Sequence, residues 1–243
     1  MSGSARYAIY FVPPAGGTFY RFGSGMLGYD CYTGADVALP RDTGLPEDWA
    51  ALTEAPRRYG FHATLCAPFR LTPECDEAAL LDAFAGFAGQ PRGVAEIRPV
   101  VRALGKFIAI VPRDRDTAVD TLAADCVRYF DRFRAPLSSD DRERRMTPTL
   151  SERERSNVDR WGYPYVLDDF CFHLTLTGTV ADDRGDILCH LLSNLFLRSH
   201  GRGTIKIDRV ALLRQDHEGA RFLALREAEL GTVPGPRARQ ALR

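Results

Sequence analysis

The sequence predicts an α+β protein with two similar lobes, each an antiparallel sheet flanked by helices, related by a pseudo-twofold axis. The order strand, helix, strand, turn, strand occurs twice along the chain. Each copy opens with a matching pentapeptide, FHATL at 61–65 and FHLTL at 172–176. A second matched pair, KFIAI at 106–110 and RFLAL at 221–225, follows the first at a similar interval in both copies. Two copies are too few for an open solenoid, so we expect two lobes.

The chain of 243 residues is long enough for one large domain or two small lobes with a substantial core. We expect a single bilobal domain over residues 1–226, with lobes near 1–135 and 136–226. An exchange of strands between the lobes stays open. Residues 227–243 lack a core pattern, and we expect a loose tail.

The first half contains strands at 6–12, 59–67, 94–101 and 107–111, and helices at 46–52, 73–88 and 117–133. The strands are β-branched or aromatic runs bounded by proline and glycine. The helix at 73–88 repeats apolar residues at helical spacing, from Leu80 to Phe87. Residues 104–106 form the turn of a hairpin. The glycine- and tyrosine-rich stretch at 16–34 favours an ordered loop with short elements.

The second half begins with a charged segment at 138–160, where Ser151 and Glu154 fit a capping box that starts a short solvated helix. A strand at 170–177, a leucine-rich helix at 186–199, strands at 204–213 and 221–225, and a turn at 217–219 follow.

Composition excludes several classes of protein. Lys plus Arg is 32 and Asp plus Glu is 32, so no global basic excess favours non-specific binding to nucleic acid or membrane. No apolar run reaches the roughly 18 residues of a membrane helix. The first residues lack a signal-peptide pattern, so we expect a cytoplasmic protein. The six cysteines form no CxxC pair and are expected to be free thiols.

The matched pentapeptides carry the chemistry. In a strand, residues i and i+2 share a face. His62 and Thr64 therefore point one way, as do His173 and Thr175, while the flanking apolar residues point to the core. If the lobes face each other, two His–Thr pairs converge on one cleft.

Two imidazoles on opposite sides of a bond supply a general base and a general acid near neutral pH. Threonine hydroxyls are uncharged donors suited to the non-bridging oxygens of a phosphate. The set suits in-line displacement at phosphorus, with the pentavalent anion stabilised by the threonines and the charged imidazole. Such a reaction requires no metal and no cofactor. The order of the two histidines as base and acid stays open.

A zinc site is the competing chemical hypothesis. Two histidines would need a third ligand, such as Asp168 or Asp169, but the first motif has no acid at a similar spacing. The remaining histidines, His190, His200 and His217, stand in no such frame and are interpreted as surface or helix residues.

At these residues the sequence resembles the two-histidine (2H) phosphoesterase superfamily, whose hallmark is a pair of hydrophobic-His-x-Thr/Ser-hydrophobic motifs. More narrowly, it is similar to the bacterial family described as phosphonate-metabolism proteins. The resemblance covers most of the chain up to about residue 225, and its segments are RYAIYF at 6–11, RYGFHATL at 58–65, FRAPLS at 133–138, WGYPYV at 161–166 and FHLTLTG at 172–178.

The resemblance implies a bilobal 2H phosphoesterase-like fold and a metal-independent phosphodiesterase acting on a ribose cyclic phosphate. His62 and His173 are then the acid–base pair, and Thr64 and Thr175 bind phosphate. The narrower family is associated with carbon–phosphorus lyase pathways, which makes ribosyl 1,2-cyclic phosphate a candidate substrate. We expect a small phosphorylated-sugar substrate and no membrane partner.

Two other functions are considered. One is an enzyme on RNA ends that cleaves 2′,3′-cyclic phosphates or 2′–5′ links, and the zero net charge argues mildly against it. The other is a non-catalytic nucleotide- or RNA-binding module, which would not need two proton-transfer groups.

Other side chains near the motifs are candidates to line the cleft. They are Arg6, Tyr10, Tyr59, Tyr163 and Tyr165. Arg214 and Arg221 lie near the last strand pair, where each could meet a second phosphate or form a surface ion pair.

Overall fold

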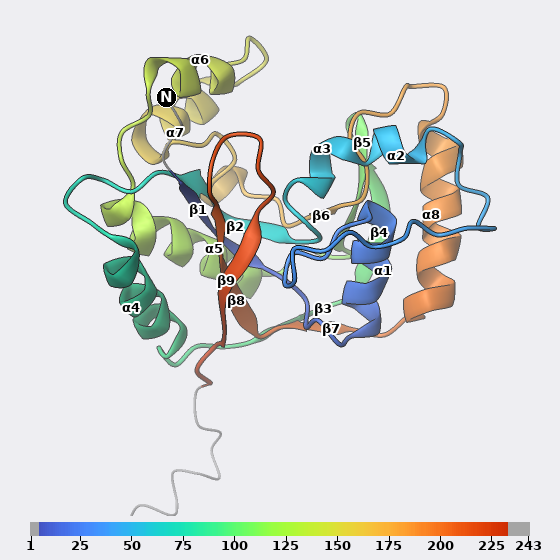
Figure 1. The fold of residues 1–243 in the computed structure, drawn as a ribbon, viewed down its shortest axis with the longest axis horizontal. Helices are drawn as coiled ribbons and strands as arrows, with labels where there is room; N and C mark the ends of the chain where they lie inside the picture. Colours follow the sequence, from blue (N-terminus) through green and yellow to red (C-terminus); the bar gives the residue numbers. More distant parts are fainter. Residues whose placement is uncertain (1–4, 233–243) are drawn as a thin grey trace, which may run out of the picture.

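The computed structural model describes residues 5–232 and shows a seven-stranded antiparallel sheet with helices packed against it (Figure 1). The strand order is β4-β5-β6-β2-β1-β8-β9. The strands are β1 (Arg6–Phe11), β2 (Ala63–Phe69), β4 (Pro99–Leu104), β5 (Phe107–Pro112), β6 (Leu174–Thr175), β8 (Arg209–Gln215) and β9 (Leu223–Glu229). Two short strands, β3 (Ala95–Ile97) and β7 (Ile205–Ile207), form a separate antiparallel pair.

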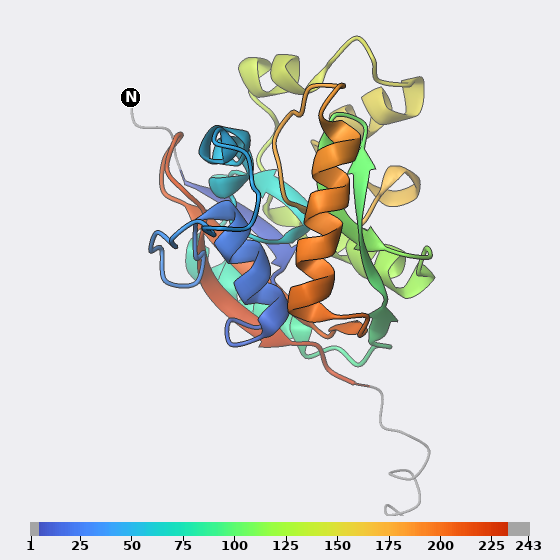
Figure 2. The ribbon, with the colours of Figure 1, turned by 90° about the vertical axis from the view of Figure 1, so that its right-hand side faces the viewer.

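The long helices fall into two groups on either side of the molecule (Figures 1 and 2). Helix α5 (Thr117–Phe130) packs on β2 and α4 (Glu77–Ala88) packs on β8 and β9, whereas α8 (Gly185–His200) packs on β4 and β5 and against α1 (Thr18–Leu27). The remaining helices are α2 (Trp49–Leu52), α3 (Glu54–Arg57), α6 (Ser139–Arg145) and α7 (Glu152–Trp161), with single 3-10 turns at Asp131–Phe133 and Leu167–Asp169.

The predicted fold class, α+β with antiparallel strands flanked by helices, is confirmed. The repeated order is also present: β2, α4, β3 and β4, then β5 in the first copy, and β6, α8, β7 and β8, then β9 in the second. The equivalent strands β3 and β7 pair antiparallel around Glu96 and Lys206, as a twofold relation between the two copies requires.

The sheet is continuous and its strand pairing crosses between the two copies. Strand β6 of the second copy pairs with β5 of the first, and β1, from the start of the chain, joins β2 of the first copy to β8 of the second. The two parts of the sheet meet where β2 pairs with β6 at Ala63 and Leu174. This junction places the two histidine motifs side by side.

Several element boundaries differ from the sequence expectation, and the strands expected at 94–101 and 204–213 each divide into two, β3 with β4 and β7 with β8. The glycine-rich stretch forms the ten-residue helix α1, because Gly23 leaves room for the Phe61 ring to pack directly on the helix backbone. Strand β2 starts at Ala63, since Gly60 has a φ of +76° and turns the chain just before it. Of the strand expected at 170–177, only the two residues of β6 have strand geometry.

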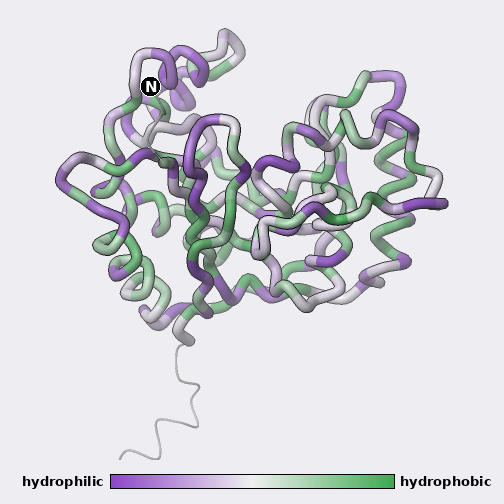
Figure 3. The backbone as a smooth tube through the Cα atoms, viewed as in Figure 1, coloured by the Kyte–Doolittle hydropathy of each residue, from purple (hydrophilic) through white to green (hydrophobic). Residues whose placement is uncertain are grey.

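The charged segment forms α6 and α7, and Ser151 and Glu154 make the predicted capping box. Figure 3 shows hydrophilic residues concentrated on this segment, beside the more apolar sheet.

The expectation of a loose tail from residue 227 is wrong for its first residues: β9 continues to Glu229, where its pairing with β8 and the ion pair of Arg209 with Glu227 hold the chain. Residues 233–243 of that tail lie outside the described residues.

One hydrophobic core runs through both parts of the sheet and includes the fully buried Phe61 and Leu174. All six cysteines are free, as predicted. Across residues 5–232, every helix is too short or too polar to cross a membrane.

Candidate functional site

The pairing of Ala63 with Leu174 brings the four motif residues together. In an antiparallel pair, the residues on either side of a bridge also face each other. His62 therefore lies across from Thr175, and Thr64 lies across from His173. The four residues form a square in which the two histidines occupy one diagonal and the two threonines the other. We call this arrangement the His–Thr square.

Burial confirms that the square lies on one face of the sheet. Phe61, Ala63 and Leu65 are at most 2% exposed, and Phe172, Leu174 and Leu176 are at most 4% exposed. The side chains of the two histidines and the two threonines are all partly exposed. The predicted alternation thus holds, although both histidines stand just before their strands and not inside them.

The imidazole of His62 is held on two sides. Its Nδ1 donates to the carbonyl oxygen of Gly60 at 3.0 Å, and its Nε2 lies 3.2 Å from Thr64 Oγ1. A carbonyl only accepts, so Nδ1 carries the proton in the neutral ring and Nε2 presents a lone pair. Thr64 donates to that lone pair in the absence of substrate.

His173 repeats this arrangement. Its Nδ1 donates to the carbonyl oxygen of Cys171 at 2.8 Å, which leaves Nε2 as the reactive nitrogen. The Phe107 ring lies 5.6 Å from the imidazole, centroid to centroid. In both motifs the carbonyl of residue i−2 orients the histidine, so the two rings are positioned by the same local turn.

The surroundings lower the pKa of both histidines. Desolvation is the largest cause for His62 and brings its pKa to about 4, aided by the charge of His173 and opposed by the Gly60 carbonyl. The ring keeps some exposed surface, but the protein atoms packed around it are dense enough for desolvation to dominate. Desolvation also lowers the pKa of His173, against the effect of the Cys171 carbonyl.

Two of the predicted lining tyrosines pack around His62. The Tyr10 ring stacks on the imidazole with 3.8 Å between centroids, and it is 1% exposed. Tyr59 lies 6.0 Å from His62 and stacks on Phe222 at 5.2 Å. Burial raises the pKa of Tyr10 well above its ordinary value, with further contributions from Tyr59 and Tyr163. Tyr10 therefore stays neutral and supports the imidazole as a flat apolar surface.

The other three predicted lining residues contact groups other than the two histidines. Tyr163 is partly buried and meets Tyr165 edge to face at 5.7 Å, while Tyr165 is 47% exposed. Arg6 lies 5.8 Å from the Phe222 ring and donates from Nε to Gln215 at 2.7 Å. Tyr165 is the most exposed of the five.

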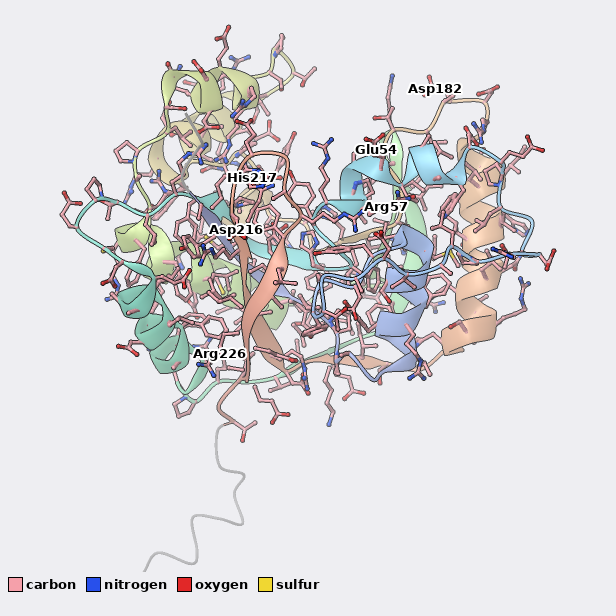
Figure 4. All side chains as sticks on the ribbon, in the orientation of Figure 1. Glu54, Arg57, Asp182, Asp216, His217 and Arg226 are labelled. Atoms are coloured by element: carbon pink, nitrogen blue, oxygen red, sulfur yellow. The ribbon has the colours of Figure 1, made fainter. Side chains whose placement is uncertain are left out.

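Several residues considered from the sequence lie elsewhere. Figure 4 shows His217 on the turn between β8 and β9, and His190 is exposed on α8. His200 packs against Phe19 and Phe196, so it is a helix residue as predicted. Arg214 and Arg221 form ion pairs, Arg214 with Glu77 and Asp216 and Arg221 with Asp36.

The acids proposed as a third zinc ligand do not accompany the histidines as a ligand set. Asp169 is bound by Arg153 at 2.8 Å and by Asn157 at 3.0 Å, and Asp168 is exposed. Within the described part of the chain, no three His, Cys, Asp or Glu side chains gather as metal ligands do.

The structure adds three residues that the sequence analysis did not propose. Phe107 and Phe222 contact the two halves of the site, and the matched KFIAI and RFLAL segments were the signal that could have indicated them. Arg145, at the end of α6, donates to the carbonyl oxygens of Pro68, at 3.1 Å, and Gly162, and lies 6.0 Å from the Tyr163 ring. A charged helix in the sequence gives no sign that one of its arginines turns inward.

Comparisons with known proteins identify relatives over most of the chain. Two curated proteins, both named ribose 1,5-bisphosphate phosphokinase PhnN, match. The one from Janthinobacterium sp. (strain Marseille) is 32% identical over 90% of this chain and 49% of its own length. The one from Laribacter hongkongensis is 33% identical over 89% of this chain and 50% of its own length. The chain thus spans about half the length of these relatives.

Two solved structures are similar at low identity. A conserved protein of unknown function from Agrobacterium tumefaciens, ATU0111, gives a TM-score of 0.43 at 12% identity, covering 92% of this chain and 85% of that one. LigT from E. coli, complexed with NADP+, gives a TM-score of 0.39 at 14% identity, covering 95% of this chain and all of that one.

A family profile described as a protein of unknown function, DUF1045, matches residues 64–223. This match covers well over half of the chain and includes both threonines of the His–Thr square. The chain therefore belongs to the DUF1045 family.

Proposed function

We propose that this protein is a metal-independent cyclic phosphodiesterase of the two-histidine type that opens a small ribose cyclic phosphate. The His–Thr square supports this proposal more than any other observation. Neighbours on the diagonal of an antiparallel pair are about 7–8 Å apart, which leaves room for a phosphoryl group between His62 and His173. In-line displacement needs the attacking and leaving oxygens on opposite sides of phosphorus, and the histidine diagonal provides that geometry.

The threonine diagonal stabilises the charge that develops. On binding, the phosphate replaces His62 Nε2 as the acceptor for the Thr64 hydroxyl, which frees this nitrogen to accept a proton from water. Thr175 donates to another non-bridging oxygen. Fixed donors aimed at the pentavalent anion contribute several kcal/mol to such reactions, on the order of 3 kcal/mol for one donor.

The electrostatics favour His62 as the base and His173 as the acid. The stronger lowering of pKa keeps His62 neutral, with its lone pair available. Water attacks phosphorus as Nε2 of His62 takes its proton. The bond from phosphorus to one ester oxygen of the cyclic phosphate breaks, and Nε2 of His173 protonates that oxygen. The product is a phosphomonoester with a free hydroxyl, and proton exchange with solvent restores both histidines.

The names of the curated relatives support a phosphorylated ribose as the substrate. Those proteins are named for a kinase of ribose 1,5-bisphosphate. This chain has no Gly-x-x-x-x-Gly-Lys-Ser/Thr phosphate-binding loop, so it lacks that common kinase motif. We therefore propose ribosyl 1,2-cyclic phosphate, in carbon–phosphorus lyase metabolism, as the substrate within this class.

A panel of cyclic phosphates tests the proposal. Ribose 1,2-cyclic phosphate, its 5-phosphate and a short RNA with a 2′,3′-cyclic end are incubated with the protein, and products are followed by phosphorus NMR and mass spectrometry. We expect ring opening of a ribose cyclic phosphate that is undiminished in excess chelator. Preference for the RNA end would indicate an RNA-processing enzyme. Binding without turnover across the panel would indicate a binding module. Loss of activity in excess chelator, with recovery when zinc is added, would indicate a metal site.

A further inference from the structure

Two arginines, Arg6 at the start of β1 and Arg145 at the end of α6, are held only by neutral groups. Arg6 donates from Nε to the side-chain oxygen of Gln215, and Arg145 donates to two main-chain carbonyls. Over residues 5–232, neither guanidinium forms an ion pair with a carboxylate. Both side chains are partly buried. Arginines in such surroundings usually bind a carboxylate or a phosphate.

The neighbours of Arg145 on α6 behave differently. Arg142 pairs with Asp159 at 2.8 Å, and Arg144 pairs with Asp141 and reaches Glu218 at 3.3 Å. The Asp141 carboxylate also acts on Arg145 at longer range, but Arg144 and Ser138 already hold it. Arg145 is therefore the arginine of this helix whose charge has no direct counter-charge.

Arg6 lies on the same face of the sheet as the square. Residues 6, 8 and 10 of β1 share one face, since β1 pairs with β8 in regular register. Tyr10 stands on this face beside Thr64 and stacks on His62. Four residues of strand separate the Cα atoms of Tyr10 and Arg6 by about 13 Å, and the arginine side chain spans part of this distance.

Arg145 reaches the same region from α6. Its guanidinium lies near the Tyr163 ring, and burial is the main cause that lowers its pKa, opposed by Asp141 and Tyr163 and aided by the charges of Arg6 and Arg134. Tyr7, next to Arg6, pairs with Phe69 of β2, and Arg145 binds the carbonyl oxygen of the adjacent Pro68, so both arginines approach the same end of β2. Two like charges in a partly desolvated site repel each other, and an anion between them would relieve this cost.

We propose that Arg6 and Arg145 form a second anion subsite, which binds a phosphomonoester carried by the substrate on a carbon remote from the cyclic ester. The proposal rests on the proposed function, because it specifies the substrate of the same site. The cyclic phosphate occupies the His–Thr square, and the second phosphate lies beyond Tyr10, between β1 and the end of α6. The subsite thus selects small bisphosphorylated sugars over singly phosphorylated ones.

A pair of substrates tests the subsite in the unmodified protein. Ribose 1,2-cyclic phosphate and its 5-phosphate differ only in the second phosphomonoester. We expect kcat/KM to be at least tenfold higher for the 5-phosphate, because a charge-assisted hydrogen bond contributes about 1.5–3 kcal/mol. Equal kcat/KM values would overturn the subsite and leave the proposed function intact, whereas no turnover of any cyclic phosphate would overturn the proposed function itself.

Three variants locate the subsite. R145Q and R6Q should lose roughly 10- to 100-fold in kcat/KM for the 5-phosphate, mainly through KM, and little for the singly phosphorylated sugar. R145K should retain part of the preference, since it keeps the charge but not the planar fork. R128Q, on the exposed side of α5, is the control and should change neither substrate.

A fourth variant tests the charge without removing either arginine. Gln215 is 3% exposed and donates to the carbonyl oxygen of Ala220 at 2.6 Å. Q215E places a carboxylate against the Arg6 guanidinium, in a side chain of the same shape as glutamine. This variant should reduce the preference for the 5-phosphate. Circular dichroism and thermal unfolding separate these effects from misfolding. An unchanged preference in R6Q, R145Q and Q215E, all folded, would assign the second phosphate to another part of the protein.

Discussion

Ala63 and Leu174 face each other across the antiparallel bridge that joins β2 to β6. Both side chains are fully buried, so the residues before and after each of them turn to the opposite face. This single pairing joins the two parts of the sheet and sets the spacing of His62, Thr64, His173 and Thr175. The strength of the bridge and the geometry of the site are therefore coupled.

Replacing either histidine should remove nearly all turnover. We expect H62A and H173A each to lower kcat by about 10²- to 10⁴-fold, the usual contribution of one proton-transfer group. Both variants should keep the wild-type circular dichroism spectrum, because the histidine face is partly exposed. H217A, on the exposed turn, serves as the matched control and should retain full activity. A folded H62A or H173A protein with wild-type turnover would contradict the assignment.

The threonines should act through their hydroxyl groups. T64V and T175V keep the shape of the side chain but remove the donor, and we expect a fall in kcat of roughly 10- to 1000-fold. T64S and T175S retain the hydroxyl and should recover much of the rate. Steady-state kinetics on the preferred cyclic phosphate measures both series. If valine and serine gave the same rate, the threonines would serve packing alone.

The pH–rate profile should be a bell displaced to the acid side of neutrality. The sequence suggests limbs near neutral pH, but the structure lowers the pKa of both histidines. In the free enzyme, kcat/KM should rise as His62 loses its proton near pH 4 and fall as His173 loses its proton at a higher pH. A bound phosphate favours charged imidazoles, so the kcat profile should lie at higher pH than the kcat/KM profile. Flat profiles between pH 4 and 8 would contradict acid–base roles.

His62 should also make stability depend on pH. Its pKa is about 4 in the folded protein and near 6.5 in the unfolded chain, so the unfolded chain binds the extra proton between these values. The contribution of neutral His62 to the free energy of unfolding is present above pH 6.5 and declines as the pH falls toward 4. Urea denaturation at pH 7 and 4.5 should show a smaller loss for H62Q than for the wild type. An equal loss of unfolding free energy in H62Q and the wild type would show that other titratable groups cause the pH dependence.

Two glycines of α1 should respond in opposite ways to alanine. A Cβ atom at Gly23 would overlap the Phe61 ring, whereas one at Gly25 meets nothing within 4 Å. We expect G23A to lower the free energy of unfolding by about 1–3 kcal/mol through overpacking and to reduce activity, because Phe61 directly precedes His62. G25A should raise stability by up to about 1 kcal/mol, the helix preference of alanine over glycine. Equal effects in thermal unfolding would show that Phe61 repacks freely.

The amino-acid sequence by itself determined the repeated order of elements and the two motifs. Apolar residues at strand and helix spacing fix which face of each element is buried, and the capping box at Ser151 and Glu154 starts α7 as the pattern indicates. These are local properties, since they depend on residues within a few positions of each other. The alternation around His62 and His173 follows from the same cause.

Only the tertiary structure decided how the two copies meet. The strand pairing across Ala63 and Leu174 joins residues more than one hundred positions apart, and no local pattern encodes that register. The same applies to Gly23, whose missing side chain matters only because Phe61 packs there, and to Arg145, which turns inward from a charged helix. Desolvation of His62 likewise arises from the packing of distant segments around the ring, so its low pKa is a property of the fold.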